Sequence, residues 1–150
     1  MNKIFITNRH QQKLAVLFDA PAPQKGLAFV MHGLGGFKEQ PHIAAVASVF
    51  KDAGFITVRF DTANTLGESD GDYEKATVTN YLHDLDDVIA WAKKQPWYQE
   101  PFVLFGSSLG GMCILLYAQQ HPEKVKALVP NVTVVSGQLS LEAHKKSNPT

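Results

Sequence analysis

Two adjacent serines between glycines are the residues whose types and spacing most directly suggest chemistry. They lie in the segment FVLFGSSLGGMCILLY, residues 102–117. The pattern Gly-x-Ser-x-Gly fits in one register only, with Gly106 and Gly110 flanking Ser108, because Ser107 has no glycines at these offsets. A serine in this pattern is a nucleophile for acyl transfer when a strand enters the turn and a helix leaves it. The sequence therefore predicts Ser108 as the candidate nucleophile.

The glycines have a physical reason. A strand that turns directly into a helix crowds the positions two residues before and after the turn, where glycine avoids a clash. The first amides of the helix are free to donate, so the N–H of Leu109 is expected to face a developing oxyanion. A phosphate-binding P-loop needs Lys and Ser/Thr where Met112 and Cys113 stand. A glycine-rich turn with no chemical role is the remaining alternative.

A second glycine-rich loop, HGLGGFKEQ at residues 32–40, follows the apolar run LAFVM. His32 and Gly33 begin it at a place where a backbone amide can point toward the serine, and Leu34 is the expected donor. A dinucleotide-binding fingerprint fails here, because Lys38 occupies the position of a small residue.

These loops need a scaffold that alternates strands and helices. Apolar or β-branched runs predict strands at residues 3–8, 13–18, 27–31, 55–60, 102–105 and 125–129. Apolar residues at helical spacing predict helices near residues 43–50, 78–92 and 109–120. This order indicates an α/β fold with a doubly wound, mostly parallel sheet after an initial antiparallel hairpin. Ligands bind at the carboxyl ends of such strands, where HGLGGFKEQ, DTANTLGESDG and GSSLGG lie.

Composition narrows the class of protein. The length of 150 residues fits a single domain, residues 1–150. Lys plus Arg and Asp plus Glu number 14 each, and they are scattered, which argues against a nucleic-acid partner. Cys113 is the single cysteine, so no internal disulfide is needed, and no membrane-length apolar run occurs. We expect a cytoplasmic location, no membrane partner, no cofactor and no metal site.

The quoted segments together resemble the α/β-hydrolase superfamily, in its bacterial esterase and serine-aminopeptidase-like branch. HGLGG is similar to the oxyanion loop, RFDTANTLGESDG to the loop after the fourth strand, and LFGSSLGG to the nucleophile turn. The resemblance covers residues 27–135 and implies a three-layer sandwich. It implies Ser108 as catalytic nucleophile, the N–H groups of Leu34 and Leu109 as the oxyanion hole, and support from His32, Gly33, Gly106 and Gly110.

The family places its catalytic acid and histidine on loops after later strands. The 150 residues end before those strands, so the sheet is expected to lack the last strands, and residues 136–150 resemble the start of a cap. The histidines present are interpreted as structural: a loop-shaping His32, and His10, His42, His83 and His121 in turns or on helix faces. Glu142 and His144 follow Ser108 in the right order, but they lie only two residues apart.

Two functions follow. The first is a serine hydrolase that cleaves small carboxylic esters through an acyl-enzyme, weak or inactive as the isolated 150 residues because no base accompanies Ser108. The alternative is a non-catalytic remnant or fragment that binds a ligand or partner. In either case, the strand at residues 125–129 is expected to leave an uncovered sheet edge that favours self-association.

Overall fold

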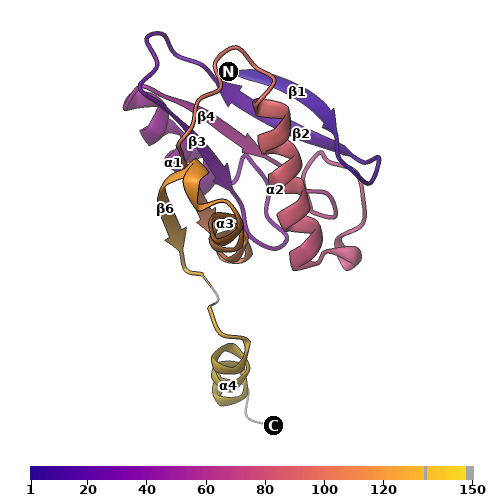
Figure 1. The fold of residues 1–150 in the computed structure, drawn as a ribbon. Coiled ribbons are helices and arrows are strands. Elements are labelled where there is room, and N and C mark those ends of the chain that lie inside the picture. Colours follow the sequence, from indigo (N-terminus) through magenta and orange to yellow (C-terminus); the bar gives the residue numbers. More distant parts are fainter. Residues whose placement is uncertain (134, 148–150) are drawn as a thin grey trace.

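Six strands form one sheet in the described residues, 1–133 and 135–147, of this computed structural model (Figure 1). Along the sheet the order is β1-β2-β4-β3-β5-β6. The first two strands are antiparallel to their neighbours, whereas β3, β4, β5 and β6 are parallel. The strands are β1 (Asn2–Thr7), β2 (Lys13–Asp19), β3 (Gly26–Met31), β4 (Phe55–Phe60), β5 (Phe102–Ser107) and β6 (Val125–Asn131). The predicted fold class is confirmed, including the initial hairpin.

Helices cover both faces of the sheet. They are α1 (Pro41–Asp52), α2 (Val78–Ala92) and α3 (Leu109–Gln120), with two short 3-10 turns, η1 (Tyr73–Lys75) and η2 (Pro122–Lys124). Because side chains alternate along a strand, β3 sends Val30 to the α1 face and Phe29 and Met31 to the α2 and α3 face. Both layers therefore hold β3 at the centre of the molecule.

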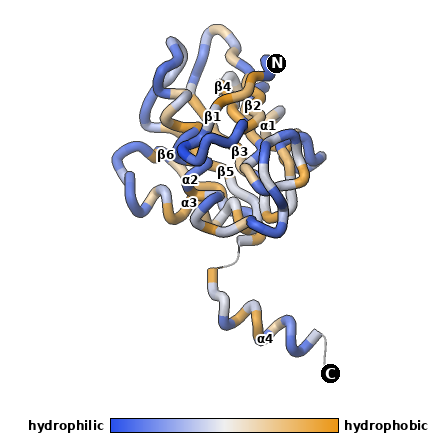
Figure 2. The backbone as a smooth tube through the Cα atoms, turned by 90° about the vertical axis from the view of Figure 1, so that its right-hand side faces the viewer, coloured by the Kyte–Doolittle hydropathy of each residue, from blue (hydrophilic) through white to orange (hydrophobic). Residues whose placement is uncertain are grey.

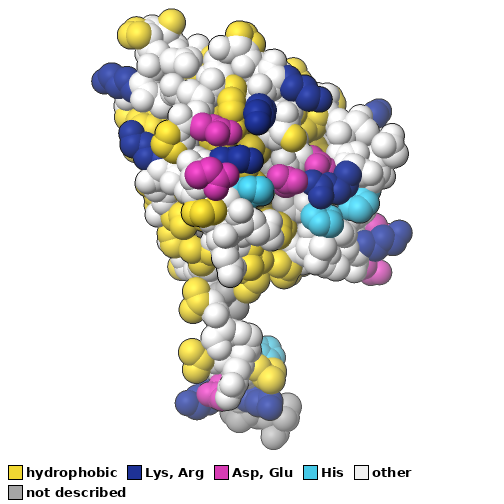
Figure 3. Space-filling model, viewed as in Figure 1, with side chains coloured by type: hydrophobic (Ala, Val, Ile, Leu, Met, Phe, Trp, Pro, Cys, Tyr) yellow, Lys and Arg dark blue, Asp and Glu magenta, His cyan; other side chains and the backbone are white. Residues whose placement is uncertain are grey.

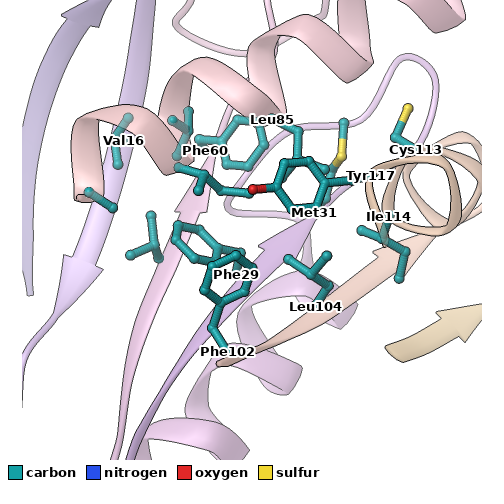
Figure 4. Packing of buried hydrophobic residues seen from close by; sticks show 14 of the residues in the cluster. Val16, Phe29, Met31, Phe60, Leu85, Phe102, Leu104, Cys113, Ile114 and Tyr117 are labelled. Carbon is teal, nitrogen blue, oxygen red and sulfur yellow. The ribbon is translucent and has the colours of Figure 1, made fainter. Parts of the chain in front are cut away.

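The larger core lies between the sheet and the pair α2 and α3. Figure 4 shows Phe29, Phe102 and Leu104 of the strands close to Tyr117 and Ile114 of α3. The rings of Phe29 and Phe102 meet edge to face, with centroids 5.0 Å apart. The third helix needs this environment because it is apolar on most of its sides, as its sequence predicts.

Helix ends follow local sequence signals. Thr77 precedes α2, and its side chain accepts a hydrogen bond from the N–H of Asn80 at 3.1 Å, which satisfies one of the free amides of the first turn. Gly54 follows α1 with φ +89°, a conformation that suits glycine. The chain then enters β4 at Phe55, so a single glycine sets the direction of the return to the sheet.

A buried carboxylate on α2 ties the first hairpin to the body. Asp84 is 1% exposed and accepts hydrogen bonds from the Asn8 amide at 2.7 Å and the N–H of Ala63 at 2.7 Å. Burial raises the pKa of Asp84 from 3.8 to about 6, although these two hydrogen bonds favour the charged form. The hairpin therefore depends on a carboxylate whose charged form is costly to bury.

We expect this carboxylate to make stability depend on pH. Between pH 4 and pH 6 the folded chain retains a proton on Asp84 that the unfolded chain releases, so the free energy of unfolding falls as pH rises. The loss is complete above about pH 6 and amounts to roughly 3 kcal/mol. Urea unfolding at pH 4, 5, 6 and 7 should show a flatter profile for Asp84→Asn. The exposed Asp52→Asn variant should keep the wild-type profile, and equal profiles for all three proteins would contradict the prediction.

The opposite edge of the sheet is uncovered within the described residues. After its first residue, every position of β6 is exposed, including Leu128 and Val129 at 36% and 41%. Figure 3 shows apolar side chains gathered on this side of the body, and Figure 2 shows the tube leaving it for a separate helix, α4 (Gly137–Ser147). No described residue of α4 is buried, and the helix projects away from the sheet (Figure 1).

An exposed apolar edge strand is a template for pairing with another chain. We therefore expect the 150-residue chain to self-associate, and sedimentation velocity over a range of concentrations measures it. Leu128→Lys together with Val129→Lys should weaken the association at least about tenfold, because charges on an edge strand oppose pairing. Val49→Lys on α1, at a residue 68% exposed, is the matched control. A wild-type chain that stays monomeric at all concentrations would refute this expectation.

Candidate active site

Ser108 occupies the single-residue turn between β5 and α3. The strand ends at Ser107, the helix begins at Leu109, and Ser108 adopts φ 51° and ψ −115°. A positive φ in a residue other than glycine costs of order 1–3 kcal/mol and persists where the surroundings hold it. Here the N–H of Ser108 donates to the Asn131 carbonyl at 2.8 Å, and its own carbonyl accepts from Met112 at 3.2 Å. The strand, turn and helix expected around Ser108 are therefore present.

The two motif glycines allow two close backbone approaches. A Cβ on Gly106 would collide with the Gly110 carbonyl and lie 2.6 Å from the nitrogen of Gly111. A Cβ on Gly110 would in turn collide with the carbonyl oxygen of His32. The first contact lets α3 start directly over the end of β5, and the second brings the loop after β3 against the start of α3. Both glycines thus act through main-chain packing.

The β3–α1 loop (His32–Gln40) lies directly beside the serine. A Cβ on Gly33 would be 3.1 Å from the Ser108 Cβ, so these two residues are in close contact. The loop turns through a hydrogen bond from the Gly36 N–H to the Gly33 carbonyl at 3.0 Å, and Gly35 adopts φ +66°. Among the described residues, the amides of Leu34 and Leu109 donate to no carbonyl in the turns and loops, unlike the amides of Gly36 and Ser108.

His32 is fully buried and both of its ring nitrogens are in use. Its Nε2 accepts a hydrogen bond from the Thr62 N–H at 3.1 Å, so the proton lies on Nδ1, which donates to the Gly33 carbonyl at 2.7 Å. Burial lowers the pKa of His32, which keeps the ring neutral. The ring joins the loop to the segment after β4, in agreement with a loop-shaping role.

A cavity of about 180 Å³ opens beside Ser108. Its lining comprises Gly33, Leu34, Gly36, Gln40, His42, Ser107 and Ser108. The imidazole of His42 was interpreted from sequence as a polar side chain early in a helix. It does occupy the second position of α1, but that position borders the cavity. The signal was available, because the glycine-rich loop leads directly into α1 and so carries the first helical turn to the site.

The other candidate groups lie elsewhere. Burial raises the pKa of Cys113 to about 12, and its side chain is in the core, so this thiol is inert. Glu142 and His144 lie on α4, away from the sheet (Figure 1). Within residues 1–133 and 135–147, no group of three or more His, Cys, Asp and Glu side chains is arranged to hold a metal ion. No helix of the same residues is long and apolar enough to cross a membrane.

Comparison with known proteins places this geometry in a family. Residues 7–144 match the family described as X-Pro dipeptidyl-peptidase (S15 family). An uncharacterized 31.7 kDa protein of the traX-finO intergenic region of Escherichia coli is 32% identical over 114 residues, which is 75% of this chain and 39% of that protein. Mitochondrial palmitoyl-protein thioesterase ABHD10 of Bos taurus is 34% identical over 108 residues, which is 68% of this chain and 33% of the relative.

Solved structures agree with these matches. Est1E from Butyrivibrio proteoclasticus, with ferulic acid bound, superposes with a TM-score of 0.78 and 29% identity over 86% of this chain and 53% of its own. Mouse α/β-hydrolase domain-containing protein 10 superposes with a TM-score of 0.74 and 27% identity over 97% of this chain and 58% of its own. The chain thus spans between a third and two fifths of the curated relatives named above. It belongs to the α/β-hydrolase superfamily, in the family described as X-Pro dipeptidyl-peptidase (S15 family).

Proposed function

We propose that the chain carries the nucleophile and oxyanion hole of a serine hydrolase that acts on carboxylic esters. The observation that carries the proposal is the conformation of Ser108, which has φ 51° at a direct strand-to-helix turn and is a partly exposed residue that lines the cavity. Such a turn raises the hydroxyl above the end of the sheet, where a substrate carbonyl can approach. The strain at Ser108 is the kind that clusters at active sites.

In this mechanism Ser108 Oγ attacks the carbonyl carbon of the ester and its proton passes to a base. The carbonyl oxygen becomes negatively charged, and the N–H groups of Leu34 and Leu109 stabilise it by donating hydrogen bonds. The alcohol then departs, leaving an acyl group on Ser108, which water removes in a second step. His32 and Gly33 support the reaction by holding the loop that carries Leu34 against the serine.

The relatives support an ester or thioester as substrate. ABHD10 is named as a palmitoyl-protein thioesterase, and Est1E binds ferulic acid. Both names describe acyl groups, which fits an acyl-enzyme on Ser108 better than any reaction that needs a cofactor. A small-molecule acyl ester is therefore the substrate class we propose. A cytoplasmic location remains a proposal, as does a single domain at residues 1–150 whose residues 136–150 begin a cap.

We further propose that the isolated 150 residues turn over slowly or not at all. A catalytic histidine needs a partner that orients its ring, and in triads this partner is a carboxylate. Within the described residues, His42 is the one imidazole that lines the cavity of Ser108, and no hydrogen bond or ion pair joins it to a carboxylate. An unoriented base leaves the serine hydroxyl a poor nucleophile.

A fluorophosphonate probe tests the assignment of the nucleophile. Labelled chain is digested, and mass spectrometry locates the adduct on Ser107 or Ser108. Because the base is unoriented, we expect slow labelling that needs a high probe concentration, with the adduct on Ser108. Labelling should be retained in Ser107→Ala, a matched variant one residue away. An adduct on Ser107 would overturn the assignment of Ser108 as the nucleophile. No adduct at any probe concentration in the folded chain would favour the alternative of a non-catalytic binding module.

A further inference from the structure

A buried lysine joins the β3–α1 loop to the loop after β4. Lys38 is 1% exposed, and its Nζ lies 2.9 Å from Asp61 Oδ2 and 2.5 Å from Glu68 Oε2. The backbone N–H of the same residue donates to Asp61 Oδ1 at 2.6 Å. Burial alone would lower the pKa of Lys38, but the hydrogen bonds to Glu68 and Asp61 raise it overall, so the ammonium stays charged. One residue therefore contributes both its main chain and its charge to the same partner.

Asp61 is as enclosed as its partner. Its side chain is fully buried, and Oδ2 also accepts the N–H of Glu68 at 2.8 Å. A Cβ on Gly67 would lie 2.7 Å from Asp61 Oδ1, so the loop after β4 closes tightly over the carboxylate. A buried charge that loses its partner is left without compensation, which makes this pair sensitive to loss of either member.

The contacts around Lys38 fix one end of a loop whose other end is fixed by His32. Besides the His32 bond to Thr62, the Thr65 hydroxyl donates to the Gly36 carbonyl, and Arg59 Nη1 donates to the Lys38 carbonyl at 3.0 Å. Leu34 lies between these anchors, and among the residues that the structure describes its main chain makes no such bond. The position of its amide therefore depends on the residues on either side.

We propose that Lys38 is a positioning residue that fixes the Leu34 amide beside Ser108 through its buried contacts with Asp61 and Glu68. The inference deepens the proposed function, because the amide serves as an oxyanion donor only if that function holds. The restraint that Lys38 places on the β3–α1 loop can nevertheless be measured without substrate, as the rate of amide hydrogen exchange. Lys38 itself touches no reacting atom and does not line the cavity.

Hydrogen exchange tests this restraint. Lys38→Met removes the charge and keeps an unbranched apolar side chain, while Lys94→Met makes the same change at an exposed residue after α2. In Lys38→Met we expect amide exchange in residues 33–40 to accelerate at least about tenfold, with β3 and β5 unchanged, as expected for local opening. Lys94→Met should exchange like the wild type. Unchanged exchange in residues 33–40, or equal acceleration in the whole chain, would overturn the proposal.

A second variant tests the same proposal if Lys38→Met does not fold. Glu68→Gln weakens one contact of the ammonium at a residue 41% exposed, and a smaller acceleration of about threefold is expected in the same segment. The fluorophosphonate reaction then links this restraint to function: Lys38→Met should lower the maximal labelling rate about 10- to 100-fold with half-saturation unchanged. If the wild type is not labelled, the proposed function fails while exchange still decides the role of Lys38.

Discussion

Replacing Ser108 with alanine is expected to abolish fluorophosphonate labelling and to lower any ester turnover of the chain at least about 10²-fold. The covalent step needs an oxygen at the strand-to-helix turn, and alanine removes it while adding no atom. The oxyanion donors remain in this variant, so the residual rate reports what the Leu34 and Leu109 amides achieve alone. The measurement is the initial rate with a short-chain aryl ester, together with gel detection of the probe.

Folding must be held constant for this comparison. Ser48→Ala removes a hydroxyl from an exposed residue of α1 that does not line the cavity, and this variant should keep the wild-type rate. Circular dichroism spectra should coincide for the wild type and both variants. Serine and alanine both carry a Cβ, so the backbone strain at residue 108 is the same in both proteins. The Ser108→Ala variant should therefore unfold at a midpoint close to that of the wild type. Turnover in Ser108→Ala at the wild-type rate would assign the reaction to another residue.

Replacing Gly106 with alanine is expected to destabilise the fold by at least about 3 kcal/mol. The added methyl would overlap the Gly110 carbonyl and lie 2.6 Å from the nitrogen of Gly111, and both are main-chain atoms that cannot move aside. Relief requires α3 to shift from the end of β5, which disturbs the larger core. Thermal or urea unfolding measures the loss, and labelling of Ser108 should fall with it.

Gly137 supplies the matched control for this substitution. It begins α4, and a Cβ there would meet no atom within 4 Å. Gly137→Ala should therefore change the free energy of unfolding by less than about 0.5 kcal/mol. If Gly106→Ala and Gly137→Ala lowered the free energy of unfolding by similar amounts, the close main-chain contacts of Gly106 would not be the cause of the destabilisation.

Much of the fold was predictable because its signals are local. The continuous apolar run before His32 and the glycines around Ser108 each lie within a few residues, and they correctly predicted a buried strand and a strand-to-helix turn. The apolar stripe of α2 likewise lies within one helix, and its predicted bounds agree with the observed Val78–Ala92. Such patterns depend on repeats of two or 3.6 residues, which the sequence displays directly.

The parts that were missed depend on distant residues. Lys38 lies in the β3–α1 loop, whereas its partners Asp61 and Glu68 lie in the loop after β4. No spacing rule in the sequence relates residues on separate loops. In the sequence, Lys38 had served only to exclude a dinucleotide fingerprint. His42 borders the cavity because α1 packs beside β5, a tertiary fact that a helical pattern does not contain. Asp84 is similar, since a carboxylate on a helix is normally solvated and only the docked hairpin buries it.

The central position of β3 has a consequence for synthesis of the chain. Phe29 pairs with Leu104, half the chain length later, so one side of β3 has no partner until β5 has left the ribosome. At roughly 5–20 residues per second, the interval lasts several seconds. During that time the run LAFVM exposes an apolar strand edge to other nascent chains. The yield of folded chain in cells should therefore increase with added chaperones and with a lower growth temperature, even when the finished chain is stable.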